Sequence, residues 1–180
     1  KKIPTVWLMG NRRRPTWGDH VMPDAYEVGS LAAHHLVHQG HRRLAFFNLN
    51  REHWPFSLYR QSFCHFAQEL GAAVTTIERT TSAEADPWHR YSPGTLNDLI
   101  KEYLAIPQRP TGIFVADDLQ VAMIQPALIQ QGIKIGPGKT QIISCNNEQP
   151  FLVGLQPPPA EIDIRVESIG RRGIDQLMWR

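Results

Sequence analysis

The stretch Arg109-Pro-Thr-Gly-Ile-Phe-Val-Ala-Asp-Asp118 decides the fold class of this chain. Residues 113–115 form an apolar, β-rich run that is too short for a helix and is bounded by Pro110 and Gly112. Such a run is typical of a strand that is buried on both faces of a parallel sheet. The stretch therefore predicts an α/β protein.

Asp117 and Asp118 end this predicted strand, and an apolar-periodic segment, residues 119–131, follows them up to Gly132. Either aspartate can act as the N-cap of the helix that this segment predicts. Open α/β sheets bind ligands where the carboxyl end of a strand meets the start of a helix. We therefore expect Asp117 to lie near whatever the protein recognises.

The composition is that of an ordinary globular domain. The 180 residues are 42% hydrophobic and 20% charged, and a chain of this size can bury about 70% of its unfolded surface without staples. The net charge of +2 is too small to predict a nucleic-acid-binding surface. Cys64 and Cys145 lie far apart, so we expect free thiols in a reducing, cytoplasmic compartment. No run approaches the ~18 apolar residues of a membrane span, so no membrane partner is expected.

Short apolar runs alternate with segments of helical period along the whole chain. The predicted strands cover 3–9, 44–47, 73–77, 113–115, 141–144 and 161–164, and the predicted helices cover 24–39, 58–70, 95–104, 119–131 and the residues from 166 onward. Residues 11–20 and 48–57 are predicted loops. Alternation at this spacing predicts βαβ units and a parallel sheet.

The sequence has no motif typical of an enzyme. Asp117 and Asp118 could form an acid/base pair, but adjacent side chains at a strand end diverge, and capping accounts for one of them. His34 and His38 have a spacing that suits a metal, but a solvated helix face is the better interpretation without a third ligand nearby. We therefore expect no catalytic residue, no metal site and no cofactor.

Polar side chains gather at the carboxyl ends of predicted strands or open the next helix, and aromatic residues lie in the loops of the same rim. The polar residues are Asn11, Arg60, Asp117 and Asn146, and the aromatic residues are Trp17, Trp54, Phe56 and Trp88. Arginine offers a fork of donors, aspartate accepts, asparagine does both, and aromatic faces stack on sugars or bases. Each residue alone could be a cap or a loop residue, but their joint placement favours a cleft for a small polar ligand. The arginine run 12–14 is either a solvated loop or an anion-capturing site at the cleft mouth.

Three stretches follow one another in the order found in a known family. They are Gly40-His41-Arg42-Arg43-Leu44-Ala45 with the helix before it, the stretch 109–118, and Ile142-Ile143-Ser-Cys-Asn-Asn147 with the later Ile169-Gly170-Arg171-Arg172. They resemble the lactose-repressor (LacI/GalR) family of bacterial transcription regulators. The resemblance covers nearly the whole chain. It implies a type I periplasmic-binding-protein-like fold, in which two αβα subdomains enclose an effector in a cleft.

The resemblance also implies a division of the chain. Residues 1–20 match the end of the N-terminal subdomain, residues 21–160 match the C-terminal αβα subdomain, and residues 161–180 match the return crossover and an N-subdomain helix. Lys1 is not a start residue, so we expect a fragment of a longer protein. The expected whole is a homodimeric regulator that senses a small effector and contacts operator DNA only through a headpiece outside this sequence.

Three positions match the effector contacts of the family: Arg60, Asp117 and Asn146. The family usually has asparagine where this chain has Asp117, and aspartate where it has Asn146. The exchange keeps the hydrogen-bonding capacity but moves the negative charge, so the effector can differ from the family's familiar sugars and purines. The residues favour a sugar or sugar derivative that also meets Asn11, Trp88 and Phe56.

Other functions remain open from the sequence. A secreted solute-binding protein of a sugar transporter would share the fold, as would the sensor core of a xylose-regulator-like protein with a C-terminal helix-turn-helix. An enzyme on an α/β sheet is a more distant alternative. The turn at 40–43 favours the regulator. A helix-turn-helix upstream of Lys1 would identify a regulator, whereas a signal peptide would identify a transporter component.

Overall fold

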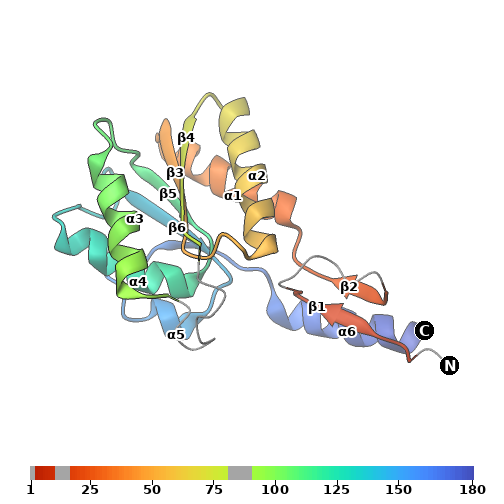
Figure 1. Ribbon diagram of the computed structural model, residues 1–180. Coiled ribbons are helices and arrows are strands. Elements are labelled where there is room, and N and C mark those ends of the chain that lie inside the picture. The colour runs from red at the N-terminus through yellow and green to blue at the C-terminus, as the bar shows by residue number, and fades with distance from the viewer. Residues whose placement is uncertain (1–2, 11–16, 81–90) are drawn as a thin grey trace.

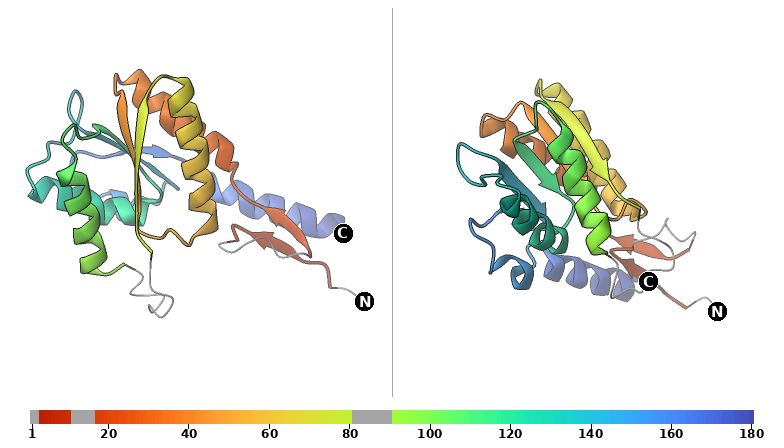
Figure 2. Two further views of the ribbon diagram at one scale, coloured as in Figure 1. Left: turned by 45° about the horizontal axis from the view of Figure 1, so that its top comes forward. Right: turned by 60° about the vertical axis from the view of Figure 1, so that its left-hand side comes forward.

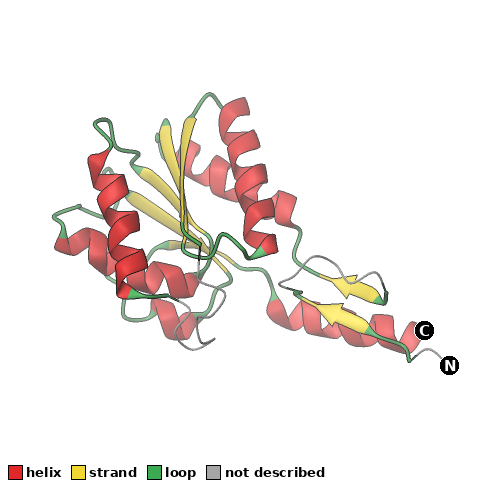
Figure 3. Ribbon diagram, in the orientation of Figure 1, coloured by secondary structure: helices red, strands yellow, loops and turns green. Residues whose placement is uncertain are grey.

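The computed structural model describes residues 3–10, 17–80 and 91–180 (Figure 1). Strands and helices alternate along these residues (Figure 3). In chain order they are β1 (Val6–Leu8), β2 (Asp19–Val21), α1 (Ala25–His38), β3 (Arg43–Asn48), α2 (Trp54–Glu69), β4 (Ala73–Glu78), α3 (Pro93–Ala105), β5 (Gly112–Val115), α4 (Asp118–Gln130), β6 (Gln141–Cys145), α5 (Gln149–Leu152), β7 (Ala160–Ile162) and α6 (Val166–Trp179).

Five strands form a parallel sheet in the order β4-β3-β5-β6-β7. Strand β3 pairs with β4 on one side and with the central strand β5 on the other, and Phe47 lies opposite Ile77 of β4 and Val115 of β5. All four residues of β5 are buried. The prediction of an α/β protein with a parallel sheet is confirmed, and β5 is the doubly buried strand that residues 113–115 predicted.

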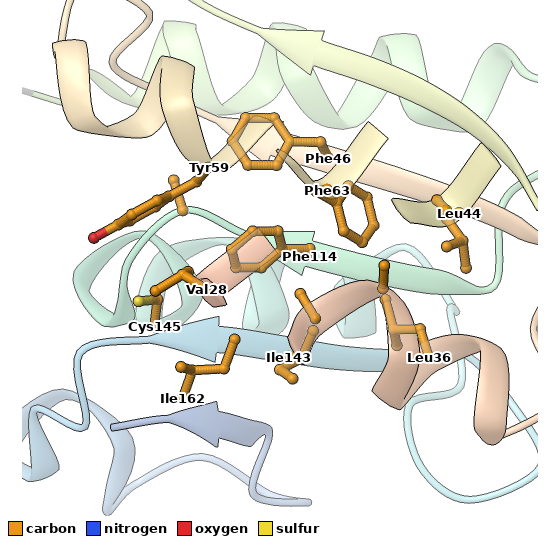
Figure 4. Packing of buried hydrophobic residues seen from close by; sticks show 14 of the residues in the cluster. Val28, Leu36, Leu44, Phe46, Tyr59, Phe63, Phe114, Ile143, Cys145 and Ile162 are labelled. Atoms are coloured by element: carbon orange, nitrogen blue, oxygen red, sulfur yellow. The ribbon is translucent and has the colours of Figure 1, made fainter. Parts of the chain in front are cut away.

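Helices cover both faces of this sheet, α1 and α2 on one side and α3 and α4 on the other (Figures 1 and 2). Alternate side chains of β3 point to opposite faces because a strand has a period of two. Leu44 and Phe46 pack under α1 and α2, whereas Ala45 and Phe47 pack under α3 and α4. Figure 4 shows the first of these cores, in which the ring of Phe114 packs 5.4 Å from that of Phe46. These layers, α1–α5 with their five-stranded sheet, are called the large lobe.

A second, smaller unit lies beside one end of the large lobe (Figures 1 and 2). Its strands β1 and β2 form a parallel pair, and α6 packs against them. Asp19 of β2 accepts a hydrogen bond of 2.8 Å from Gln176 and pairs with Arg180, both near the end of α6. This small lobe (β1, β2 and α6) therefore joins residues that are about 160 positions apart in sequence.

The structure corrects several predicted boundaries. The predicted loop 11–20 contains the start of β2, whose three residues are partly polar and gain their order from pairing with β1. Helix α2 begins at Trp54 rather than at residue 58, because Pro55 occupies the first turn, where its missing N–H costs nothing. Similarly, α3 begins at Pro93, with Ser92 as its N-cap instead of Thr95. The short helix α5 was not predicted.

Candidate functional site

A cavity of about 190 Å³ lies between the small lobe and the carboxyl edge of the five-stranded sheet. Its lining comes from the ends of β1, β2, β5 and β6 and from the start of α2. The lining residues are Met9, Met22, Pro23, Ala25, His53, Pro55, Phe56, Tyr59, Tyr91, Asp117 and Asn146. Carboxyl ends of strands from both sheets therefore face a common space, which is where α/β sheets bind ligands.

Asp117 lies in this lining as the N-cap of α4. Its backbone is extended, and its carboxylate accepts hydrogen bonds from the Gln120 backbone N–H (2.8 Å) and from the Gln120 side-chain amide (3.1 Å). Each carboxylate oxygen keeps a further lone pair for a ligand, because an ionised carboxyl group has about four acceptor positions. The capping role and the cavity position predicted for Asp117 coincide in one side chain.

The charge of Asp117 is poorly compensated. Only 8% of the residue is exposed. Burial raises the pKa of its carboxyl group to about 6, the bonds from Gln120 oppose this rise, and the neighbouring Glu148 and Asp118 add to it. Asp118 accepts a hydrogen bond of 2.6 Å from the Glu148 backbone N–H, and burial raises the pKa of Asp118 as well. Three carboxyl groups, those of Asp117, Asp118 and Glu148, therefore lie close together at the end of the cavity near β5 and β6.

Asn146 follows β6 and lines the same end of the cavity. Its backbone N–H donates to the Ile162 carbonyl at 3.0 Å, which extends the β6–β7 ladder, and its φ of 119° is rare for any residue but glycine. Its amide donates a long bond of 3.4 Å to Glu148. Residues held in unusual backbone conformations concentrate at ligand sites.

Aromatic rings form the wall of the cavity at α2. The imidazole of His53 packs against Phe56 with ring centroids 4.0 Å apart and the rings tilted by 40°, and Phe56 lies 6.1 Å from Tyr59. Tyr59 is buried, and burial raises the pKa of its hydroxyl group. Of the aromatic residues predicted on the rim, Phe56 is thus in place. Pro55 fixes where α2 begins, and the first two turns of this helix place Phe56 and Tyr59 in the cavity lining.

Arg60 is not among the residues that line this cavity. Its guanidinium Nε lies 3.3 Å from a Glu78 carboxylate oxygen at the end of β4, and the other Glu78 oxygen accepts 3.0 Å from Asn48. Arg60 also lies within α2 rather than at its beginning. The structure therefore shows a structural partner for this arginine at the sheet edge beside the site.

The remaining predicted rim residues have other surroundings. Trp54 lines a neighbouring groove with Tyr26 and Leu58 instead of this cavity. Trp17 is largely exposed and packs edge-on against Trp7 in the small lobe. Asn11 and Trp88, together with the arginine run 12–14, lie outside the described residues.

Several lining residues were not predicted from the sequence. His53 lines the cavity as the N-cap of α2, which begins four residues earlier than expected, and the missed signal was Pro55 at a helix start. Tyr59 lies farther along the same helix, one residue before Arg60. Met22 lines the cavity because it directly follows β2, most of which lies in the predicted loop 11–20. Tyr91 precedes the N-cap of α3, and no pattern in the sequence marks it.

Within residues 3–10, 17–80 and 91–180, histidine, cysteine and carboxylate side chains form no group of three that could hold a metal ion. Over the same ranges, no helix is both long enough and apolar enough to cross a membrane.

Residues 33–180 match a family described as a periplasmic binding protein-like domain. The HTH-type transcriptional repressor PurR of Edwardsiella ictaluri is 25% identical over 188 residues, which cover all of this chain and 50% of that protein. Two solved structures have the same fold. A LacI family transcriptional regulator of Enterococcus faecalis with bound ribose has a TM-score of 0.73 and 24% identity, over 99% of this chain and 60% of that one.

The second structure is a periplasmic binding protein/LacI transcriptional regulator of Alkaliphilus metalliredigens in complex with D-xylulofuranose. It has a TM-score of 0.73 and 21% identity, over 97% of this chain and 61% of that one. The chain thus spans about half the length of the curated relatives that it matches.

Proposed function

The chain belongs to the family of periplasmic-binding-protein-like domains, and from this premise we propose that it is the effector-sensing core of a LacI-type transcription regulator. The observation that carries the proposal is the cavity between the lobes. Its lining joins Met9 and Met22 of the small lobe to Asp117 and Asn146 of the large lobe. A ligand held there contacts both lobes at once.

Such a ligand changes the relative populations of conformations. Contacts to both lobes favour the arrangement in which the lobes approach each other, and the shift is as large as the difference in affinity between the two arrangements. Only two short connections, residues 23–24 and 163–165, join the described parts of the lobes, with Met22 at the end of β2 counted in the small lobe. In the whole protein, this shift would alter how a dimer presents its DNA-binding headpieces.

We propose a sugar or sugar derivative as the ligand. Each sugar hydroxyl both donates and accepts, which suits the Asp117 carboxylate beside the Asn146 amide, and the ring of Phe56 offers a face for stacking. A cavity of about 190 Å³ is smaller than the roughly 300–1,000 Å³ of pockets for drug-sized molecules, so it suits a small ligand such as a monosaccharide. The ribose and D-xylulofuranose held by two structures of the same fold support this class. Arg60, beside the site, remains a proposed contact that requires release from Glu78.

The wider protein is also a matter of proposal. We place residues 1–20 and 161–180 in an N-terminal subdomain and residues 21–160 in a C-terminal one. The whole is proposed as a cytoplasmic homodimer that binds operator DNA through a headpiece outside this sequence. The curated repressor relatives favour this over a secreted solute-binding protein of the same fold. Because it binds rather than transforms its ligand, no enzymatic activity is proposed.

Titration calorimetry of the intact protein with neutral pentoses and hexoses tests the proposal. Saturating ligand at about 100 times its dissociation constant should raise stability by roughly 2.7 kcal/mol, which shifts the melting temperature by about 5–10 °C. Asp117→Ala and Asn146→Ala should each weaken binding by about 1–3 kcal/mol because ligand groups lose their partners.

Asp98→Ala is the control, since the exposed Asp98 carboxylate on α3 pairs only loosely, at 3.9 Å, with Lys101 of the same helix and lies outside the cavity lining. It should bind as the wild type does. A sugar that binds equally well to all three variants would show that this cavity is not its site. If neither these neutral sugars nor their charged derivatives bind, the proposed ligand class is wrong.

A further inference from the structure

We propose that the cavity selects its ligand by charge, preferring a monosaccharide-sized ligand that carries a protonated amine, such as an amino sugar, and rejecting the corresponding anionic sugar. This inference rests on the proposed function, because it assigns the chemical class of the ligand at the same site. It departs from the expectation of a sugar in general, because sugar acids and sugar phosphates carry the opposite charge.

The described lining contains one carboxylate, that of Asp117, and no lysine or arginine. Two further carboxylates lie near Asp117 outside this lining and add negative charge. Asp118 accepts from the Glu148 backbone at 2.6 Å, and the Glu148 carboxylate lies within 3.4 Å of the Asn146 amide. An anionic ligand would meet three negative charges at this end of the cavity, whereas an ammonium group would be attracted by all of them.

The arginine beside the site is already engaged. Arg60 lies 3.3 Å from Glu78, and Glu78 is held in turn by Asn48 at 3.0 Å. A ligand carboxylate could recruit Arg60 only by displacing Glu78 from it. The pair therefore contributes little net charge to the neighbourhood of the cavity.

Burial disfavours the charged form of Asp117, and a nearby cation would stabilise it. The raised pKa of this carboxyl group, about 6, is the physical consequence of a charge that no described cation in the cavity balances. Gln120 supplies two hydrogen bonds but no charge. A ligand ammonium would supply both a charge and donors, and a charge-assisted hydrogen bond is about twice as strong as a neutral one.

The aromatic part of the lining also suits a cation. The rings of Phe56, Tyr59 and Tyr91 line the same cavity as the Asp117 carboxylate. An ammonium group within about 6 Å of an aromatic face is attracted to the ring. His53 packs against Phe56, and among the described lining residues it is the side chain that acid could make cationic. Charge selectivity is therefore best measured at pH 8, where an ordinary histidine is neutral.

A series of sugars that differ only in charge tests the inference. The probes are 6-amino-6-deoxy-D-glucose, D-glucose and D-glucuronate on one ring, with D-ribose and D-ribose 5-phosphate as a smaller pair. Calorimetry with the intact protein at pH 8 should show the amine binding at least tenfold more tightly than glucose. Each anion should bind at least tenfold more weakly than its neutral parent. An exposed ion pair gives about fivefold at most, so a tenfold preference indicates a desolvated partner.

Asp117→Asn removes the charge but keeps an oxygen that can cap α4, and the charge order should then shrink to within about threefold. The control Asp98→Asn removes a carboxylate of α3 that lies outside the cavity lining and should leave the order unchanged. Glucuronate binding as tightly as the amine, or an order that survives Asp117→Asn, would overturn the charge selection while leaving a sugar-binding function in place. Absence of binding by all five probes would instead contradict the proposed function itself.

Discussion

The Asp117 carboxyl group caps α4, lines the cavity and is almost fully buried. Its pKa of about 6 lies above its ordinary value of 3.8. Between these two pH values the unfolded chain releases a proton that the folded chain keeps. The stability of the fold therefore falls as pH rises from about 4 to 6, and above pH 6 the fold carries a penalty on the order of 3 kcal/mol.

Asp117→Asn should remove this penalty while keeping a side-chain oxygen for the Gln120 backbone N–H. We expect its free energy of unfolding to exceed that of the wild type by about 1–3 kcal/mol at pH 7.5 and to be nearly equal at pH 4. Urea unfolding at pH 4, 5.5 and 7.5 measures the difference. Glu148, Asp118, His53, Tyr59 and Cys145 face or adjoin the same carboxyl group, but both proteins retain them. If the free energy of unfolding of Asp117→Asn were lower than that of the wild type by the same amount at all three pH values, Asp117 would be a structural cap and nothing more.

At this scale the sequence predicted some residues and not others for an identifiable reason. Asp117 lies two residues after the buried strand β5 and Asn146 directly follows β6, so strand periodicity alone placed them at the sheet edge. The orientation of Arg60 on α2 depends on Glu78, which lies 18 positions later at the end of strand β4. Nothing in the local pattern around Arg60 shows that pairing. The place of His53 in the cavity wall could be predicted only from the correct start of α2.

At the scale of elements, the close contact between α1 and α2 holds one face of the large lobe together. A Cβ atom on Gly29 would lie 2.4 Å from the Phe63 backbone nitrogen and 2.5 Å from the Ser62 Cβ. Ser62 also donates a hydrogen bond of 2.6 Å to the Tyr26 carbonyl of α1. The two helices can approach this closely only because residue 29 has no side chain.

Gly29→Ala should therefore force the helices apart and lower the free energy of unfolding by about 1–3 kcal/mol or more. The matched control is Gly170→Ala in α6, where a Cβ atom would meet nothing within 4 Å. That change should raise stability by up to about 1 kcal/mol through helix propensity. Chemical denaturation of both variants provides the comparison. Equal effects of the two substitutions would mean that the α1–α2 contact is looser than described.

Element boundaries were predicted less well than element types. The strands β3, β5 and β6 are apolar runs, and their burial between two helical layers produces that pattern directly. By contrast, β2 is the short polar segment Asp19–Val21, whose order comes from β1 and from contacts with α6 at the far end of the chain. The first turn of α2 contains Pro55 between two aromatic residues, which resembles a loop unless proline is considered as a helix starter.

At the scale of the whole molecule, the proposed function depends on two lobes that share a cavity. The match to periplasmic-binding-protein-like domains and the fold shared with LacI family regulators confirm the resemblance inferred from short stretches of sequence. Periodicity could not show the position of the small lobe, because contacts between β1, β2 and α6 join the two ends of the chain. The space between the lobes exists only after those ends meet.

The four methionines of the chain offer a direct test of the central claim, that a ligand binds between the lobes. Met9 and Met22 line the cavity from the small lobe, whereas Met123 of α4 is partly buried against the core of the large lobe and Met178 is exposed on α6. The measurement is a titration of the intact, methyl-labelled protein with a sugar that binds, followed by methionine methyl NMR. We expect the Met9 and Met22 signals to shift together with one dissociation constant, and those of Met123 and Met178 to shift little. Saturable binding that leaves the Met9 and Met22 signals unmoved would contradict the account.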